Sequence, residues 1–312
     1  MSAPRNERGV ALITVLLIVT VLTAIVARLS LSNEVWIRQV EGGAALAQAD
    51  QVSRAAQQWV GLLLAKDTNQ FDGRTEPWAR PLPPLPVGWG ELTGHVEDRQ
   101  GRFNLNNLVT SKGKVDAGAM AKFQRLLRLL GLNPAIADAA VDWIDKNQQP
   151  HGSGGAEDAF YQGRKPPYLA ANRPFADPAE VRLLRGVDGK AWQKLQPYIA
   201  ALPEATGVNV NTASPQVLAA VIRSWGPPRL ALAKAKKWAK RTDKQPFTKT
   251  DQARRAMGIS GTQGTGTGLT VMTNYFLVHT RASFGDVSRS FATLYRRSGS
   301  KVEIVRHSTE IR

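Results

Sequence analysis

An uninterrupted apolar segment near the amino terminus constrains this chain more than any other feature. Residues 10–27 contain no charged side chain. As a helix, these roughly 18 positions would extend about 27 Å, close to the thickness of a membrane's hydrocarbon core. The segment ends at Arg28, without the small-residue cleavage site that closes a secretory signal peptide. We therefore expect it to remain in the mature protein as a membrane-spanning helix.

The helical pattern continues well beyond the apolar segment. No proline interrupts residues 10–66, and apolar residues recur at spacings of three and four, which predicts one apolar face. We expect a single helix on the order of 80 Å long. Residues 10–28 would span the membrane, and residues 29–66 would form its amphipathic continuation. The residues expected on the apolar face are Val52, Ala56, Trp59 and Leu63.

The short segment before the apolar helix indicates its orientation and its processing. Arg5 and Arg8 precede the helix, and the positive-inside rule keeps such an amino terminus in the cytoplasm. A short basic leader that ends in Gly9 and opens directly into an apolar helix resembles the class III signal of type IV pilins and pseudopilins. This resemblance implies a leader of residues 1–9, cleavage between Gly9 and Val10 by a prepilin peptidase, and methylation of the new Val10 amine. An ordinary signal anchor is the alternative.

One position departs from the common pilin pattern. The fifth residue after the expected cleavage is Thr14, where most pilin-like proteins carry Glu. In those proteins the carboxylate is thought to pair with the terminal amine of a neighbouring subunit within the membrane. A threonine cannot form that ion pair. The substitution therefore either weakens the resemblance or selects one branch of it.

The body of the chain combines strand-like and helical patterns. Residues 67–112 hold a proline-rich link, PWARPLPPLPVGWG, and a segment that alternates like two strands, GELTGHVEDRQGRFNLNNLV. Residues 113–206 are helical, residues 207–260 form a second small helical module, and residues 261–312 return to antiparallel strands. The fold class is therefore α+β. We expect a long amino-terminal helix packed on an antiparallel sheet, with an inserted all-helical domain of the SAM-like or helix-hairpin-helix-like kind.

The helical middle resembles a known family. VDWIDKNQQPHGSGGAEDAFYQGRKPPYLAANRPFADPAEVRLL is similar to the helical domain of the K component of type II secretion systems, and GRFNLNNLV and VNVNTASPQVLAAV are similar to segments on either side. The resemblance extends from Gly9 to about Arg297. That family characteristically lacks the Glu at position five, so Thr14 supports the assignment.

The resemblance implies a function in assembly and not an enzyme. The chain would be a minor pseudopilin of the type II secretion system, anchored in the bacterial inner membrane with its body in the periplasm. It would form the tip of the pseudopilus, initiate assembly and aid export of folded proteins across the outer membrane. The implied partners are other minor pseudopilins, the major pseudopilin, the prepilin peptidase, the inner-membrane assembly platform and, further, secreted substrates.

The charge of the chain supports a rival function. With 41 Lys and Arg against 25 Asp and Glu, the net charge is +16, which suits a nucleic acid or an anionic surface. Residues 208–221 also resemble a helix-hairpin-helix module, which binds phosphates through backbone N–H groups. The adjoining hairpin, RSWGPPRLAL, offers few such donors, because proline has none. A membrane-tethered periplasmic DNA-binding protein is therefore the alternative. In the structural interpretation, Asn209 and Asn211 tie a loop to a helix capped by Ser214.

Oxygen-bearing side chains around a glycine-rich loop form a candidate cation site. They bracket residues 151–155, HGSGG, and hard oxygen ligands of this kind suit calcium. The spacing does not match an EF-hand, although members of the resembled family can bind calcium. The alternative is a set of helix caps and solvated acids. The candidate ligands are Asp142, Asp145, Asn147, Glu157 and Asp158.

Other site chemistries find less support. The chain has no cysteine, which excludes disulfides, thiol catalysis and cysteine-bound zinc. Its four histidines, at positions 95, 151, 279 and 307, are scattered and form no HExxH motif. Calcium is therefore the only cofactor that the sequence suggests.

Overall fold

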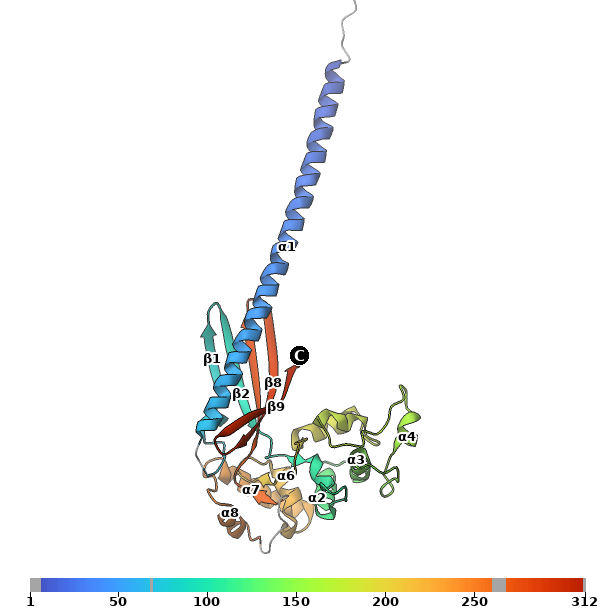
Figure 1. The fold of residues 1–312 in the computed structure, drawn as a ribbon, viewed down its shortest axis with the longest axis vertical. Helices are drawn as coiled ribbons and strands as arrows, with labels where there is room; N and C mark the ends of the chain where they lie inside the picture. Colours follow the sequence, from blue (N-terminus) through green and yellow to red (C-terminus); the bar gives the residue numbers. More distant parts are fainter. Residues whose placement is uncertain (1–6, 68–69, 260–267, 311–312) are drawn as a thin grey trace, which may run out of the picture.

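The longest element of the structure is the amino-terminal helix. The computed structural model describes residues 7–67, 70–259 and 268–310, and α1 is continuous over Glu7–Lys66, which confirms the predicted single helix. Its amino-terminal half projects away from the body (Figure 1). From Val10 to Glu41 every side chain is exposed, and burial against the body begins at Ala45. Most of the predicted leader, residues 1–6, lies outside the described residues.

The second half of α1 packs on a sheet through a stripe of mostly small side chains. Ala45, Ala49 and Ala56 are buried against the sheet, and the stripe continues through Val60 and Leu64. Ala56 was expected on this face, but Trp59 was not correctly placed, since it is 53% exposed. Small residues let the helix backbone approach the sheet closely, so a bulky indole is accommodated only at the side of the contact.

The sheet has five strands in the order β1-β2-β7-β8-β9, all antiparallel (Figure 1). The last three strands form the predicted meander, with turns at both expected positions. The inserted helical region leaves the sheet after β2 and returns at β7. The strand bounds are Leu82–Val87 for β1, Gly90–Asp98 for β2, Tyr275–Phe284 for β7, Val287–Ser298 for β8 and Lys301–Glu310 for β9.

Two details of the predicted first strands were wrong. The proline-rich segment was predicted to be a link before the first strands, yet its residues LPPLPV form edge strand β1, where the missing N–H donors can face solvent. The alternation that resumes at Phe103 was predicted to form a second strand through Leu105. Instead, β3 is only Phe103–Asn104 and pairs in parallel with β4, Ile199–Ala200. The Asn104 side chain accepts a hydrogen bond from the Asn106 backbone N–H (3.2 Å), which begins the 3-10 helix Leu105–Leu108 and ends the strand.

The insertion between β2 and β7 is built mainly from short helices, as predicted. Asp177 and Glu180 form a capping box, and Ser214 caps α6 through the Val217 N–H (3.3 Å). A second short parallel pair joins β5, Val208–Asn209, to β6, Leu269–Thr270. The helices are α2 Ala117–Leu129, α3 Ile136–Ile144, α4 Asp158–Gln162, α5 Gly189–Leu195, α6 Pro215–Val221, α7 Pro228–Thr242 and α8 Thr250–Ala256, with 3-10 turns at Pro178–Leu183, Gln196–Tyr198 and Arg223–Trp225. Another 3-10 turn, Pro77–Ala79, lies outside the insertion, between α1 and β1.

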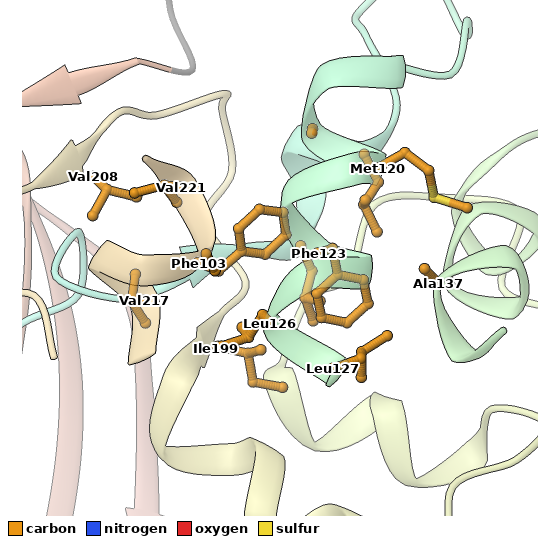
Figure 2. Packing of buried hydrophobic residues seen from close by; sticks show 14 of the residues in the cluster. Phe103, Met120, Phe123, Leu126, Leu127, Ala137, Ile199, Val208, Val217 and Val221 are labelled. Carbon is orange, nitrogen blue, oxygen red and sulfur yellow. The ribbon is translucent and has the colours of Figure 1, made fainter. Parts of the chain in front are cut away.

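One hydrophobic cluster extends through most of the described part of the insertion (Figure 2). Phe123 and Leu126 of α2 lie fully buried at its centre, and Phe123 stacks on Phe103 with ring centroids 5.2 Å apart. Ile199 and Val217 reach the same cluster from later segments. The two helical modules expected at residues 113–206 and 207–260 therefore share one core.

Candidate functional site

The projecting half of α1 is the most apolar exposed surface in the described structure. The 57 residues Val10–Lys66 contain an 18-residue window of mean hydropathy 2.9, none of it buried in the body. By length and composition this helix can cross a membrane. Within it, the Thr14 hydroxyl donates to the Ala11 carbonyl oxygen (2.9 Å). The hydroxyl is thus satisfied by its own helix, as expected for a threonine in lipid.

Apolar side chains also remain exposed beyond the expected membrane span. Val35, Trp36, Ile37 and Val40 are each at least half exposed, between the membrane segment and the body. Water is a poor environment for such a patch, which is typical of surfaces that contact protein or lipid. This part of α1, residues 35–40, is called the stalk below, and it offers a surface for association with other molecules.

The acidic loop is organised by a buried carboxylate. Asp142 on α3 is fully buried, and its oxygens accept hydrogen bonds from the backbone N–H groups of His151 (2.9 Å) and Ala156 (2.6 Å). Gly155 lies against this carboxylate, and a Cβ there would collide with it. Burial raises the pKa of Asp142 to about 6, although these hydrogen bonds oppose the increase. The loop is therefore wrapped around a carboxylate that it only partly stabilises.

Glu157 is the least satisfied acid of the set. Only 4% of the residue is exposed, and neither carboxylate oxygen has a hydrogen-bond partner. Its pKa is raised to about 7, mainly by burial and in addition by the negative charges of Asp142, Asp145 and Asp158. A bare buried carboxylate among other acids is an arrangement that a cation would stabilise.

The other predicted ligands differ in their fit to such a site. Asp145 is buried and contributes to the negative field at Glu157, but the acids of this loop are not among the described side chains whose ligand atoms converge within 4.8 Å in groups of three. The Asp158 carboxylate accepts from the Ala170 N–H (2.9 Å). Asn147 is exposed, and its side-chain oxygen accepts from the Gln149 N–H (2.8 Å), which makes it a turn residue. Sequence reasoning missed Asp138, whose carboxylate accepts from the Gly154 N–H (3.1 Å); its position one helical turn before Asp142 was the available signal.

The hairpin that suggested phosphate binding is hydrogen-bonded to another helix of the same protein. Arg125 of α2 donates through Nε to the Ala219 carbonyl oxygen (2.7 Å) and through Nη2 to the Gly226 carbonyl oxygen (2.5 Å). Asn209 and Asn211 were expected to tie their loop to the helix capped by Ser214, but their side-chain amides donate instead to the carbonyl oxygens of Asp72 and Phe247 (3.0 and 2.9 Å). This segment therefore serves to pack helices together.

The fold and the exposed helix define a class of protein: a membrane-anchored, pilin-like subunit that carries an inserted helical domain. Residues 101–204 match the family model for "Type II secretion system (T2SS), protein K". The chain is 34% identical to the type II secretion system protein K of Pseudomonas aeruginosa over 96% of this chain and 92% of that one. It is 34% identical to the protein K of Aeromonas hydrophila over 71% of this chain and 72% of that one. The chain therefore belongs to the type II secretion system protein K family.

A solved structure has the same fold. It comes from the crystal structure of the GspK-GspI-GspJ complex of the enterotoxigenic Escherichia coli type 2 secretion system. The similarity has a TM-score of 0.71 at 24% identity and covers 88% of this chain and 98% of the other. This family membership favours the secretion interpretation over the DNA-binding alternative.

Proposed function

We propose that this chain is a minor pseudopilin that occupies the tip of the periplasmic pseudopilus, initiates its assembly and aids export of folded proteins across the outer membrane. The observation that carries the proposal is the helical domain inserted between β2 and β7. It lies at the end of the body farthest from the amino-terminal end of α1 (Figure 1). In a fibre held together by parallel α1 helices, a domain in this position would obstruct a subunit added beyond it. A subunit with such a domain therefore belongs at the tip of the fibre.

The proposed partners are other minor pseudopilins, because the similar solved chain comes from a complex titled GspK-GspI-GspJ. The exposed apolar residues of the stalk, from Val35 to Val40, are a suitable contact surface for neighbouring helices. The major pseudopilin, the inner-membrane assembly platform and secreted substrates are the further partners that this function requires.

The proposed topology places the amino terminus in the cytoplasm and the body in the periplasm. The basic residues Arg5 and Arg8 before the membrane span support this orientation. A prepilin peptidase would cut between Gly9 and Val10, and the new Val10 amine would be methylated. The apolar helix extends without a break from Glu7, just before the cleavage position, into the body, which supports its retention after cleavage.

We further propose that the acidic loop binds calcium through Asp142, Asp145 and Glu157, with Asp158 adding negative charge. The two unpartnered oxygens of Glu157 support this assignment. When bound, the ion would supply positive charge that neutralises the buried carboxylates and stabilises the loop. Asp142 would also continue to hold the loop through its two backbone hydrogen bonds.

Capture of companion pseudopilins tests the assembly function. Full-length protein in detergent should capture the other minor pseudopilins of its own system, and Val35→Asp should weaken capture at least about tenfold because it places a charge in an apolar contact. Gln39→Asp is the matched control, since it adds the same charge at an exposed polar position of the same helix. Salt-sensitive binding to duplex DNA without capture of any pseudopilin would instead support the DNA-binding alternative.

A further inference from the structure

Two histidines and a glutamate, far apart in the sequence, meet on strands β2 and β7. His95 and His279 are directly opposite each other in the register, and their rings stack with centroids 4.6 Å apart and planes 12° apart. Glu97 lies two residues beyond His95, so it points to the same face of the sheet. Its Oε1 lies 3.6 Å from His95 Nε2 and 4.0 Å from His279 Nε2.

These side chains converge closely enough to share one ion. One ligand atom from each residue can be chosen so that all three lie within 4.8 Å of one another. The cluster lies on the sheet face opposite α1, because Leu92 and Val96, at the alternate positions of β2, pack with residues of α1. The side chains of His95, Glu97 and His279 are 44%, 33% and 18% exposed, so an ion from solvent can reach them.

The charged side chains around the cluster indicate which kind of ion it can bind. Arg99 and Arg102 contact Glu97 through its other oxygen, Oε2, at 3.3 and 2.6 Å. These guanidinium groups lower the pKa of Glu97 against the effect of burial, which keeps the carboxylate ionised, and they leave Oε1 on the side of the histidines. The same positive charges oppose a hard cation that is held by charge alone. Two imidazole nitrogens favour a borderline metal that forms strong bonds to nitrogen.

We propose that His95, Glu97 and His279 bind a zinc ion. Two histidines and one carboxylate are a ligand set that zinc accepts, with the fourth position left to water or to a group from another molecule. The ion would join β2 to β7, the two strands between which the helical domain is inserted. Zinc would therefore fix the base of that domain. This site shares no residue with the acidic calcium loop.

Competition with a chromogenic zinc chelator tests the proposal on full-length protein in detergent, stripped of metal and then saturated with calcium. Saturating calcium occupies the acidic loop, so the zinc measured belongs to another site. We expect one equivalent of zinc to be held, with an affinity at least about tenfold lower in His95→Gln and in His279→Gln. Affinity should also fall between pH 7.5 and pH 6, because the imidazoles must lose their protons to bind the metal.

The remaining two histidines provide matched controls. His151→Gln and His307→Gln should retain zinc binding within about twofold of the unsubstituted protein, since neither residue belongs to the cluster. Glu97→Gln, which keeps the size of the side chain, should weaken zinc binding without the loss of an imidazole. Melting temperatures in chelator show whether each variant is folded. The proposal is overturned if the unsubstituted protein holds no equivalent of zinc, or if the folded double variant of His95 and His279 binds zinc as well as the unsubstituted protein does.

Discussion

At the scale of single residues, the buried acids of the loop have direct energetic consequences. Glu157 lacks any hydrogen-bond donor at its carboxylate, whereas Asp142 accepts from two backbone N–H groups. Both pKa values are raised, to about 7 and about 6 respectively. Folding therefore places ionised acids where they are poorly stabilised, unless they bind a proton or a cation.

The pH dependence of stability follows from the pKa of Glu157. Because folding raises this pKa from 4.5 to about 7, the folded protein binds the proton more tightly than the unfolded chain does. Without calcium, the contribution of Glu157 to the free energy of unfolding should therefore decrease as the pH rises from about 4.5 to about 7. In chelator at pH 8, Glu157→Gln should be more stable than the unsubstituted protein by on the order of 2 kcal/mol, and the two should converge near pH 5.

Denaturant unfolding at both pH values, with calcium and with chelator, measures this effect. Calcium at a concentration one hundred times its Kd should raise the free energy of unfolding of the unsubstituted protein by about 2.7 kcal/mol. It should have little effect on that of Glu157→Gln. Equal calcium stabilisation of both proteins would remove Glu157 from the site. Exposed Asn147→Asp is a useful comparison, since it adds a carboxylate outside the buried cluster.

A second residue-scale prediction concerns processing at Gly9. A charged side chain at the last leader position should obstruct the prepilin peptidase, so Gly9→Glu should leave a slower-migrating precursor in the membrane. Electrophoresis of membrane fractions from cells with and without the peptidase detects it. If Gly9→Glu is processed at the normal rate, the chain does not carry a class III leader.

At the scale of elements, the most specific contact is the one between α2 and the hairpin of α6 and α7. Arg125 provides two donors to the carbonyl oxygens of Ala219 and Gly226. Removing them would leave both acceptors without these partners at a partly buried contact. This is a structural use of the segment that had also suggested phosphate binding.

Arg125→Met should therefore lower the free energy of unfolding by about 2 kcal/mol, since two hydrogen bonds from a charged donor are lost while the apolar stem is kept. Arg128→Met, an exposed arginine on the same helix, should change it by less than about 0.5 kcal/mol. Chemical denaturation of both variants provides the comparison. If the two substitutions have equal effects, this contact does not hold the hairpin to α2.

Elements with a strong local signal could be predicted from the sequence, whereas tertiary pairing could not. The long helix, the meander and the capping box at Asp177 all follow from short-range patterns. Strand β1 was missed because its prolines are tolerated only at a sheet edge, which a sequence alone does not define. The acidic loop could be found from its composition. The lack of hydrogen-bond partners at the Glu157 carboxylate depends on tertiary packing. The pairing of His95 with His279 depends on which strands become neighbours across a long insertion.

At the scale of the whole molecule, the long helix and the inserted domain have different consequences for assembly. The stalk of α1 offers an apolar surface that many subunits could share. The inserted domain sits at the opposite end of the body (Figure 1), where it would obstruct further growth. Thr14 agrees with this asymmetry, because its hydroxyl bonds to Ala11 in its own helix and provides no negative charge for the amine of another subunit.

The account predicts that this protein cannot extend a fibre by itself. Expressed without the other pseudopilins it should form no fibres, and its overproduction should shorten fibres because too many are started. Electron microscopy of sheared preparations measures both effects. Long fibres from this protein alone would show that the inserted domain does not block addition of subunits.

The position of this subunit within the fibre tests the central claim most directly. Quantitative immunogold labelling of sheared pseudopili, with an antibody against the inserted helical domain, counts its copies and locates them. The account predicts one copy, or very few, at a single end of each fibre. Copies distributed evenly along the shaft would contradict it.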